Sequence, residues 1–128
     1  MLRLIVFWFS WLWAVVFVPI ETYLSFLRTP FPFSGYTVNV VGVGITLWGS
    51  VSLRRGRAYG EGVLAAGWAW TAAVFWRATN LRYWYAAEIG DLSFGPIELW
   101  LAPLFTAMAV GAFLCSLVLL VRRHAQTD

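Results

Sequence analysis

The sequence predicts an all-α integral membrane protein whose four transmembrane helices form one bundle. Of the 128 residues, 61% are hydrophobic and 12% are charged, whereas soluble domains are about 45–50% apolar and about 25% charged. Four long apolar stretches alternate with short segments that contain Arg, Gly or Pro. Because short connections make consecutive helices antiparallel neighbours, residues 1–128 are expected to fold as a single domain.

The first two helices are expected at 4–27 and 36–53. An apolar run of about 17 residues follows Arg3, and no small-residue cleavage pattern comes after it. This run is too long for the apolar region of a typical signal peptide, so we interpret it as a retained helix. Two prolines, at 30 and 32, disfavour helix between the two spans. The second span contains glycines that allow a neighbouring helix to approach closely: Gly42, Gly44 and Gly49.

The third helix is expected at 61–87 and the fourth at 96–121. The third would be about 27 residues and about 40 Å long, longer than the roughly 30 Å hydrocarbon core. Its last turns are therefore expected to project beyond the outer membrane surface, where the turn from Gly90 to Pro96 would cap it. Both helices carry small residues at a spacing of four, which favours close helix packing: Ala65, Ala69 and Ala73 in the third, and Ala107, Gly111 and Cys115 in the fourth.

The arginines predict the orientation of the bundle. Six of them fall on the side of the two termini and three on the other: Arg3, Arg54, Arg55, Arg57, Arg122 and Arg123 against Arg28, Arg77 and Arg82. Because cytoplasmic loops carry the excess of basic residues, both termini are expected in the cytoplasm. The expected location is the inner (plasma) membrane of a bacterium or archaeon.

Candidate site residues gather at the outer end of the predicted bundle, within and around the stretch 76–98. Arg77, Asn80 and Trp84 are spaced to share one helical face, and an arginine fork suits a carboxylate or a phosphate headgroup. Asn39 is expected at the same depth on the second helix. Arg82 and the acidic Glu88 are further charged candidates for binding a ligand or a partner at this end.

Glu21 and Arg77 are expected to pair, because both lie near the outer ends of their helices. An ionisable side chain at that depth needs a partner or water. Two interpretations remain open for such a pair. It would either line an outward-facing site or simply tie the first helix to the third. The many aromatic residues at this end form either an interfacial belt or a groove for a flat amphipathic ligand.

Metal and haem chemistry is disfavoured by composition. Cys115 and His124 are the single cysteine and the single histidine, so the chain cannot assemble a side-chain metal site of the usual kind. No cofactor is expected by side-chain ligation, although a bound lipid, quinone or pigment is compatible with the sequence. The basic residues do not form a long cluster, so no nucleic-acid partner is expected.

Three functions of different classes are compatible with these observations. The sequence lacks the patterns of serine hydrolases and zinc proteases, which favours a non-catalytic accessory or scaffold subunit of a membrane complex. Its partners would be membrane lipids, other membrane subunits or further copies of the chain. The alternative is a small transporter or an amphipathic-ligand-binding protein that uses Glu21 and Arg77. A lipid-modifying enzyme acting at the outer headgroups is a third possibility.

Overall fold

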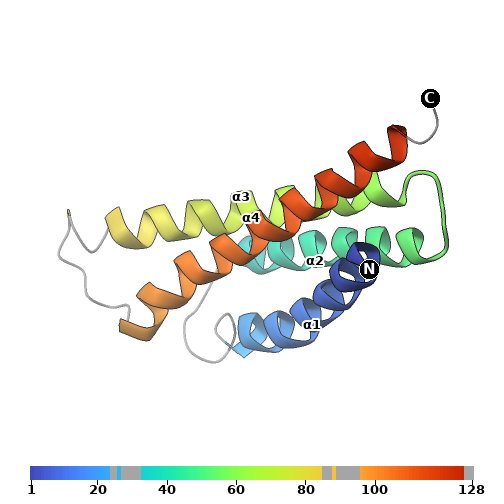
Figure 1. The fold of residues 1–128 in the computed structure, drawn as a ribbon. Coiled ribbons are helices and arrows are strands. Elements are labelled where there is room, and N and C mark those ends of the chain that lie inside the picture. The colour runs from blue at the N-terminus through green and yellow to red at the C-terminus, as the bar shows by residue number, and fades with distance from the viewer. Residues whose placement is uncertain (24–25, 27–32, 85–87, 89–95, 126–128) are drawn as a thin grey trace.

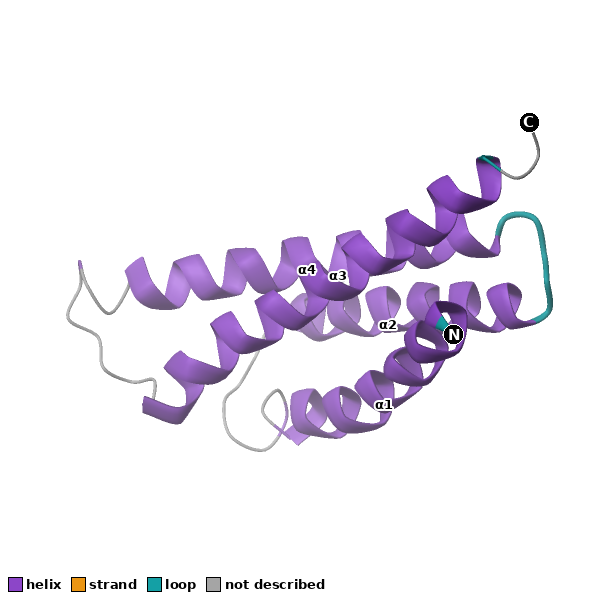
Figure 2. Cartoon of the chain, in the orientation of Figure 1, coloured by secondary structure: helices purple, strands orange, loops and turns teal. Residues whose placement is uncertain are grey.

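The computed structural model describes residues 1–23, 26, 33–84, 88 and 96–125. Within these residues the chain forms α-helices and no strand. The helices are α1 (Leu2–Tyr23), α2 (Phe33–Arg54), α3 (Gly60–Trp84) and α4 (Pro96–His124) (Figure 1). Figure 2 shows how little of the described chain lies outside helix, mainly the loop that joins α2 to α3. The prediction of an all-helical fold is confirmed.

The helix boundaries differ from the expected ones at several ends. α2 begins at 33 instead of 36, and α4 continues to 124 instead of 121. The predicted ends of the first and third helices, at 27 and 87, lie outside the described residues. So does the turn at 90–95, and the predicted projection of α3 beyond the membrane therefore stays a prediction.

Three of the described helices are long and apolar enough to cross a membrane. The corresponding spans are Leu2–Tyr23, Tyr36–Arg54 and Trp100–His124. α3 is 25 residues long, but its glycines, tryptophans and polar residues make it less apolar than the others. Four spans were predicted, so the crossing of α3 is not established by length and composition.

The exterior of the bundle is apolar, and hydroxyl groups are placed inside. Large side chains such as Leu12, Val15 and Val121 are more than half exposed. In contrast, several serines and threonines are buried and donate to the carbonyl four residues earlier in their own helix: Ser10, Thr46, Thr71, Thr106 and Ser116. This distribution suits lipid outside and internally satisfied polar groups inside.

α2 and α3 pack closely because one residue at each of their tightest contacts is glycine. Cβ atoms built at the four glycines would lie 2.5–2.7 Å from the facing helix, which is closer than side chains tolerate. The contacts join Gly60 to Leu53, Gly49 to Leu64, Gly67 to Thr46 and Gly42 to Trp70. Along α2 these positions step by four, three and four residues, as expected for one continuous seam between antiparallel helices.

The seam corrects the predicted small-residue faces. Gly42 and Gly49 pack against α3 as expected, but a Cβ at Gly44 would meet nothing within 4 Å. On α3 the seam uses glycines 60 and 67, whereas Ala73 of the predicted alanine face is exposed. An α-helix has 3.6 residues per turn, so residues spaced by four rotate gradually around its axis. A row of alanines at this spacing therefore does not face the same neighbouring helix along its whole length.

Aromatic side chains fill the space where α1, α3 and α4 meet. The Trp13 ring lies 5.3–5.6 Å from the rings of Phe17, Trp68, Phe75 and Phe105, measured between centroids. Pairs at this separation contribute about 0.5–1.5 kcal/mol beyond the area they bury. α1 has few close backbone contacts with α3, which packs mainly against α2 and α4. These rings are therefore the main link between α1 and α3 in the middle of the bundle.

Candidate functional site

The predicted outer site is only partly assembled in the structure. Glu21 of α1 accepts a hydrogen bond of 2.6 Å from the side-chain amide of Asn39 on α2. Both residues are partly buried. A charge-assisted bond of this kind fixes the two helices relative to each other at this depth. The structure therefore brings Glu21 and Asn39 together.

Arg77 does not pair with Glu21. Its side chain is exposed on α3, and no ion pair between the two is found among the described residues. The reason lies in the helix arrangement, because the backbone of α1 approaches α2 closely and has few close contacts with α3. The α2 side chain of Asn39 consequently occupies the position that Arg77 was expected to take. The predicted ion pair between Glu21 and Arg77 is therefore not formed among the described residues.

The remaining candidates lie apart from this pair. Asn80 is exposed and donates to the carbonyl of Trp76, one turn earlier in the same helix, over 3.0 Å. Trp84 and Glu88 are exposed. Arg82 belongs to α3, but its side chain lies outside the described part of the structure. Asn80, Arg82 and Trp84 belong to the last turns of α3, and these candidates do not line a described cavity together.

Two tryptophans in the middle of α3, Trp68 and Trp70, each have an acceptor for the indole N–H, as a buried indole usually does. The indole N–H of Trp68 donates to the Ser10 hydroxyl over 3.3 Å, and that of Trp70 donates to the Val38 carbonyl over 3.2 Å. Trp68 is fully buried in the core, whereas Trp70 is partly exposed. Both contacts join α3 to a neighbouring helix, which favours packing over ligand binding as their role.

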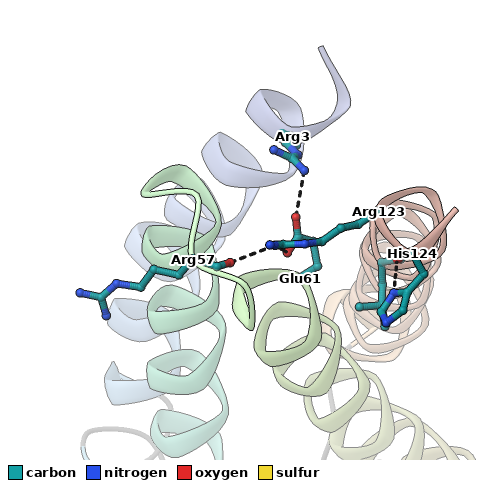
Figure 3. Close-up of polar contacts among 6 residues, drawn as sticks. Arg3, Arg57, Glu61, Arg123 and His124 are labelled. Atoms are coloured by element: carbon teal, nitrogen blue, oxygen red, sulfur yellow. Dashed lines mark hydrogen bonds and ion pairs between the residues drawn. The ribbon is translucent and has the colours of Figure 1, made fainter. Parts of the chain in front are cut away.

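The strongest polar cluster lies at the opposite end of the bundle, around Glu61. This carboxylate is 1% exposed, and Arg3 and Arg123 contact its two oxygens at 3.0 and 2.6 Å (Figure 3). Arg123 also donates to the carbonyl of Arg57 over 3.0 Å. One buried acid thus connects α1, α3, α4 and the α2–α3 loop. We call Glu61, Arg3 and Arg123 the ion-pair clasp.

Local backbone structure explains how Glu61 reaches this position. Gly56 adopts a φ of 68° in the loop, a conformation that glycine takes without strain. Gly60 then lets the start of α3 approach the backbone of Leu53, where any Cβ would collide at 2.6 Å. Glu61 follows in the first turn of α3, where the helix dipole favours an acid. The short loop therefore places the Glu61 carboxylate within reach of Arg3 and Arg123.

The α2–α3 loop beside the clasp contains Tyr59, whose pKa is affected by nearby arginines. Arg57 donates a hydrogen bond of 2.6 Å to the Tyr59 hydroxyl. This bond lowers the pKa of Tyr59 below its usual value of 10.0, and the nearby charge of Arg55 acts in the same direction. The tyrosine lies in the loop between α2 and α3 and is exposed.

Comparison of the chain with protein-family models, curated proteins and solved structures finds no match.

Chemically, the clasp is suited to holding helices together. Both carboxylate oxygens are already bonded to guanidinium groups, which leaves neither positioned to take a proton from a substrate. No group of three His, Cys, Asp or Glu side chains that could hold a metal occurs in the described ranges. The geometry therefore supports a structural role for the charges near the termini.

Sequence reasoning missed the clasp because it treated these arginines only as markers of orientation. A signal was available in Glu61 itself, which is the one acid of the sequence between Glu21 and Glu88. It begins a helix on the side that collects six of the nine arginines. An acid so placed has several cationic candidates, although the sequence does not reveal which two reach it.

Proposed function

We propose that this chain is a non-catalytic integral membrane protein that acts as an accessory or scaffold subunit. The observation that supports this most directly is the ion-pair clasp, in which the buried charges connect helices and leave no carboxylate oxygen unoccupied. The aromatic core around Trp13 and Trp68 is similarly devoted to packing. Because these interior side chains contact one another, a binding function of the bundle is expected on its outer surface.

α3 is proposed to cross the membrane with the other three helices. Its contacts with α4 run from the Glu61–Arg123 ion pair to the bond of 2.9 Å between the hydroxyls of Thr79 and Thr106. The segment 61–79 thus lies beside the apolar span of α4 and extends about 27 Å, close to the roughly 30 Å of the hydrocarbon core. The lower apolarity of α3 follows from its central place between α2 and α4.

Both termini are proposed to be cytoplasmic. The start of α1, the end of α4 and the α2–α3 loop lie at the same end of the bundle (Figure 1), and this end holds six of the nine arginines. Such an excess of basic residues is retained on the cytoplasmic side.

A labelling experiment tests this topology. In a Cys115→Ala background, Arg57→Cys is expected to react with a membrane-impermeant maleimide only after the cells are opened. Glu88→Cys, at the other end, is expected to react in intact cells, because α3 carries the chain across. Labelling of both positions from the same side would contradict the crossing of α3. Reaction of Arg57→Cys alone in intact cells would reverse the orientation.

The partner-binding surface is proposed at the outer ends of α3 and α4. Trp76, Trp84 and Trp100 are 64%, 51% and 76% exposed there, and tryptophan is enriched where one protein binds another. Native mass spectrometry from mild detergent is expected to detect a larger membrane subunit or further copies of the chain. Trp100→Ala is expected to reduce that complex, whereas Trp48→Ala, an exposed tryptophan of α2, is the control. A strictly monomeric wild-type protein would refute the proposal.

A small ligand-binding role is kept as a second candidate because α1 and α4 leave a crevice between them. Its volume is about 140 Å³, and it is lined by apolar side chains: Phe9, Leu12, Trp13, Val16, Phe17, Phe105 and Met108. Such a lining suits part of a lipid chain or the ring of a quinone or pigment. The same native spectra would show such a molecule as a defined added mass.

A further inference from the structure

A basic pocket lies next to the clasp, between α1 and the end of α2. It has a volume of about 250 Å³. The pocket is lined by Arg3, Leu4, Phe7, Leu53, Arg54 and Gly56. Two arginines therefore border a small space whose other walls are mainly apolar. It lies at the membrane end that carries both termini.

The charge in this pocket is not balanced by the described residues. Among the described residues at this end there are six arginines and one acid, Glu61. Arg3 and Arg123 already contact the oxygens of Glu61. The Arg54 guanidinium carbon lies 4.8 Å above the Phe7 ring, and no ion pair is found for Arg54 in the described ranges. Stacking on an aromatic ring orients the group while leaving its N–H donors available.

An apolar groove continues from the pocket along α1. Leu4 borders both, and the groove is lined by side chains that include Trp8, Trp11 and Val15. From Leu4 to Val15 the helix rises about 17 Å, which is close to half of the roughly 30 Å hydrocarbon core. The surface thus joins a cationic head region to an apolar strip as long as one leaflet.

We propose that this composite surface binds an anionic phospholipid, with the phosphate at Arg3 and Arg54 and an acyl chain along α1. Guanidinium groups recognise phosphate through paired N–H donors, and basic pockets on the cytoplasmic side of membrane helices bind anionic headgroups. The inference rests on the proposed membrane placement of the termini. It needs no partner subunit, so its failure would leave the subunit proposal intact.

The test uses delipidated protein in detergent, titrated with phosphatidylglycerol or phosphatidylcholine and measured by native mass spectrometry. Wild type is expected to bind phosphatidylglycerol at least fivefold more tightly. Arg54→Gln is expected to lose about fivefold of that preference, the effect of one arginine near a membrane surface. Arg55→Gln is the matched control, because this neighbouring arginine is exposed and does not line the pocket. Thermal unfolding of each variant confirms that it is folded.

Equal binding of the two lipids by wild type would overturn the proposal, as would equal losses in Arg54→Gln and Arg55→Gln. A separate arm adds inorganic phosphate at the concentration of the lipid. The lipid is expected to stay bound, because the α1 groove contributes to its affinity. Displacement by equimolar phosphate would assign the pocket to a soluble phosphate group and overturn the lipid as its ligand.

Discussion

Replacing Glu61 with alanine is expected to lower the free energy of unfolding by about 3 kcal/mol. The carboxylate is 1% exposed, and its removal leaves two arginines facing each other at the junction of α1, α3 and α4. Breaking a buried ion pair by deleting one partner costs about 3–5 kcal/mol. We place the value at the lower end because Arg3 is 55% exposed, so water would solvate its charge after the change.

The two arms of the clasp are expected to differ. Arg3→Ala should cost about 0–1 kcal/mol, as exposed pairs do. Arg123→Ala should cost more, since this side chain is 28% exposed, contacts Glu61 at 2.6 Å and also bonds the Arg57 carbonyl. Its loss would leave a buried carboxylate with a single, weaker partner.

Equilibrium unfolding in one mixed-micelle system measures these differences. Glu88→Gln is the control, because Glu88 is exposed and surface substitutions usually stay within about 0.5 kcal/mol. Glu61→Gln keeps the size and shape of the side chain but removes its charge. The amide also places N–H donors opposite one of the guanidinium groups, which has no acceptor for them. An unchanged unfolding midpoint in Glu61→Gln would show that the clasp does not stabilise the fold.

The fold was predictable because its main determinants are local. Long apolar stretches set the helices, and Gly and Pro mark where they are interrupted, so α2 and α4 appear close to their expected positions. Which residues share a depth also follows from the spacing along each helix. That reasoning placed Glu21, Asn39 and Arg77 near one end of the bundle.

The contacts between helices were less predictable because they depend on rotation and neighbour choice. Glu21 has two candidates at its depth, and the sequence does not state that α2 rather than α3 lies beside α1. The structure selects Asn39. The ion-pair clasp was also not predicted, because it too depends on which helices are neighbours. Glu61 and Arg123, which form its shortest contact, are 62 residues apart in the sequence.

Glycine was a partial guide, since Gly42 and Gly49 were expected to face a neighbouring helix and do so. On α3 the prediction relied on a row of alanines, whereas the close contacts are made at Gly60 and Gly67.

Gly49→Ala is expected to destabilise the bundle by about 2–3 kcal/mol. A Cβ at this position would lie 2.5 Å from the Leu64 nitrogen and 2.6 Å from its Cα. Both are backbone atoms of α3, which cannot yield as a flexible side chain would. The two helices must therefore separate locally, and overpacking of this kind typically costs about 1–3 kcal/mol.

Gly44→Ala is the matched control and is expected to have the opposite sign. It makes the same change five residues away in the same helix, where a Cβ would meet nothing within 4 Å. Alanine is favoured over glycine inside a helix by about 0.5–1 kcal/mol, so this variant should be slightly more stable than wild type. Thermal unfolding of both proteins in one detergent gives the comparison. Equal shifts in the same direction would show that glycine at 49 acts through helix propensity and not through the seam.

The double variant Gly49→Ala, Gly67→Ala tests whether the seam behaves as a unit. A Cβ at Gly67 would lie 2.7 Å from the Thr46 nitrogen, so this change pushes apart the same two helices about one turn away. Once one alanine has separated them, the second meets less resistance, and the combined loss is expected to be smaller than the sum. Fully additive losses would mean that α2 and α3 yield independently at each contact. The continuous antiparallel seam would then lose its energetic support.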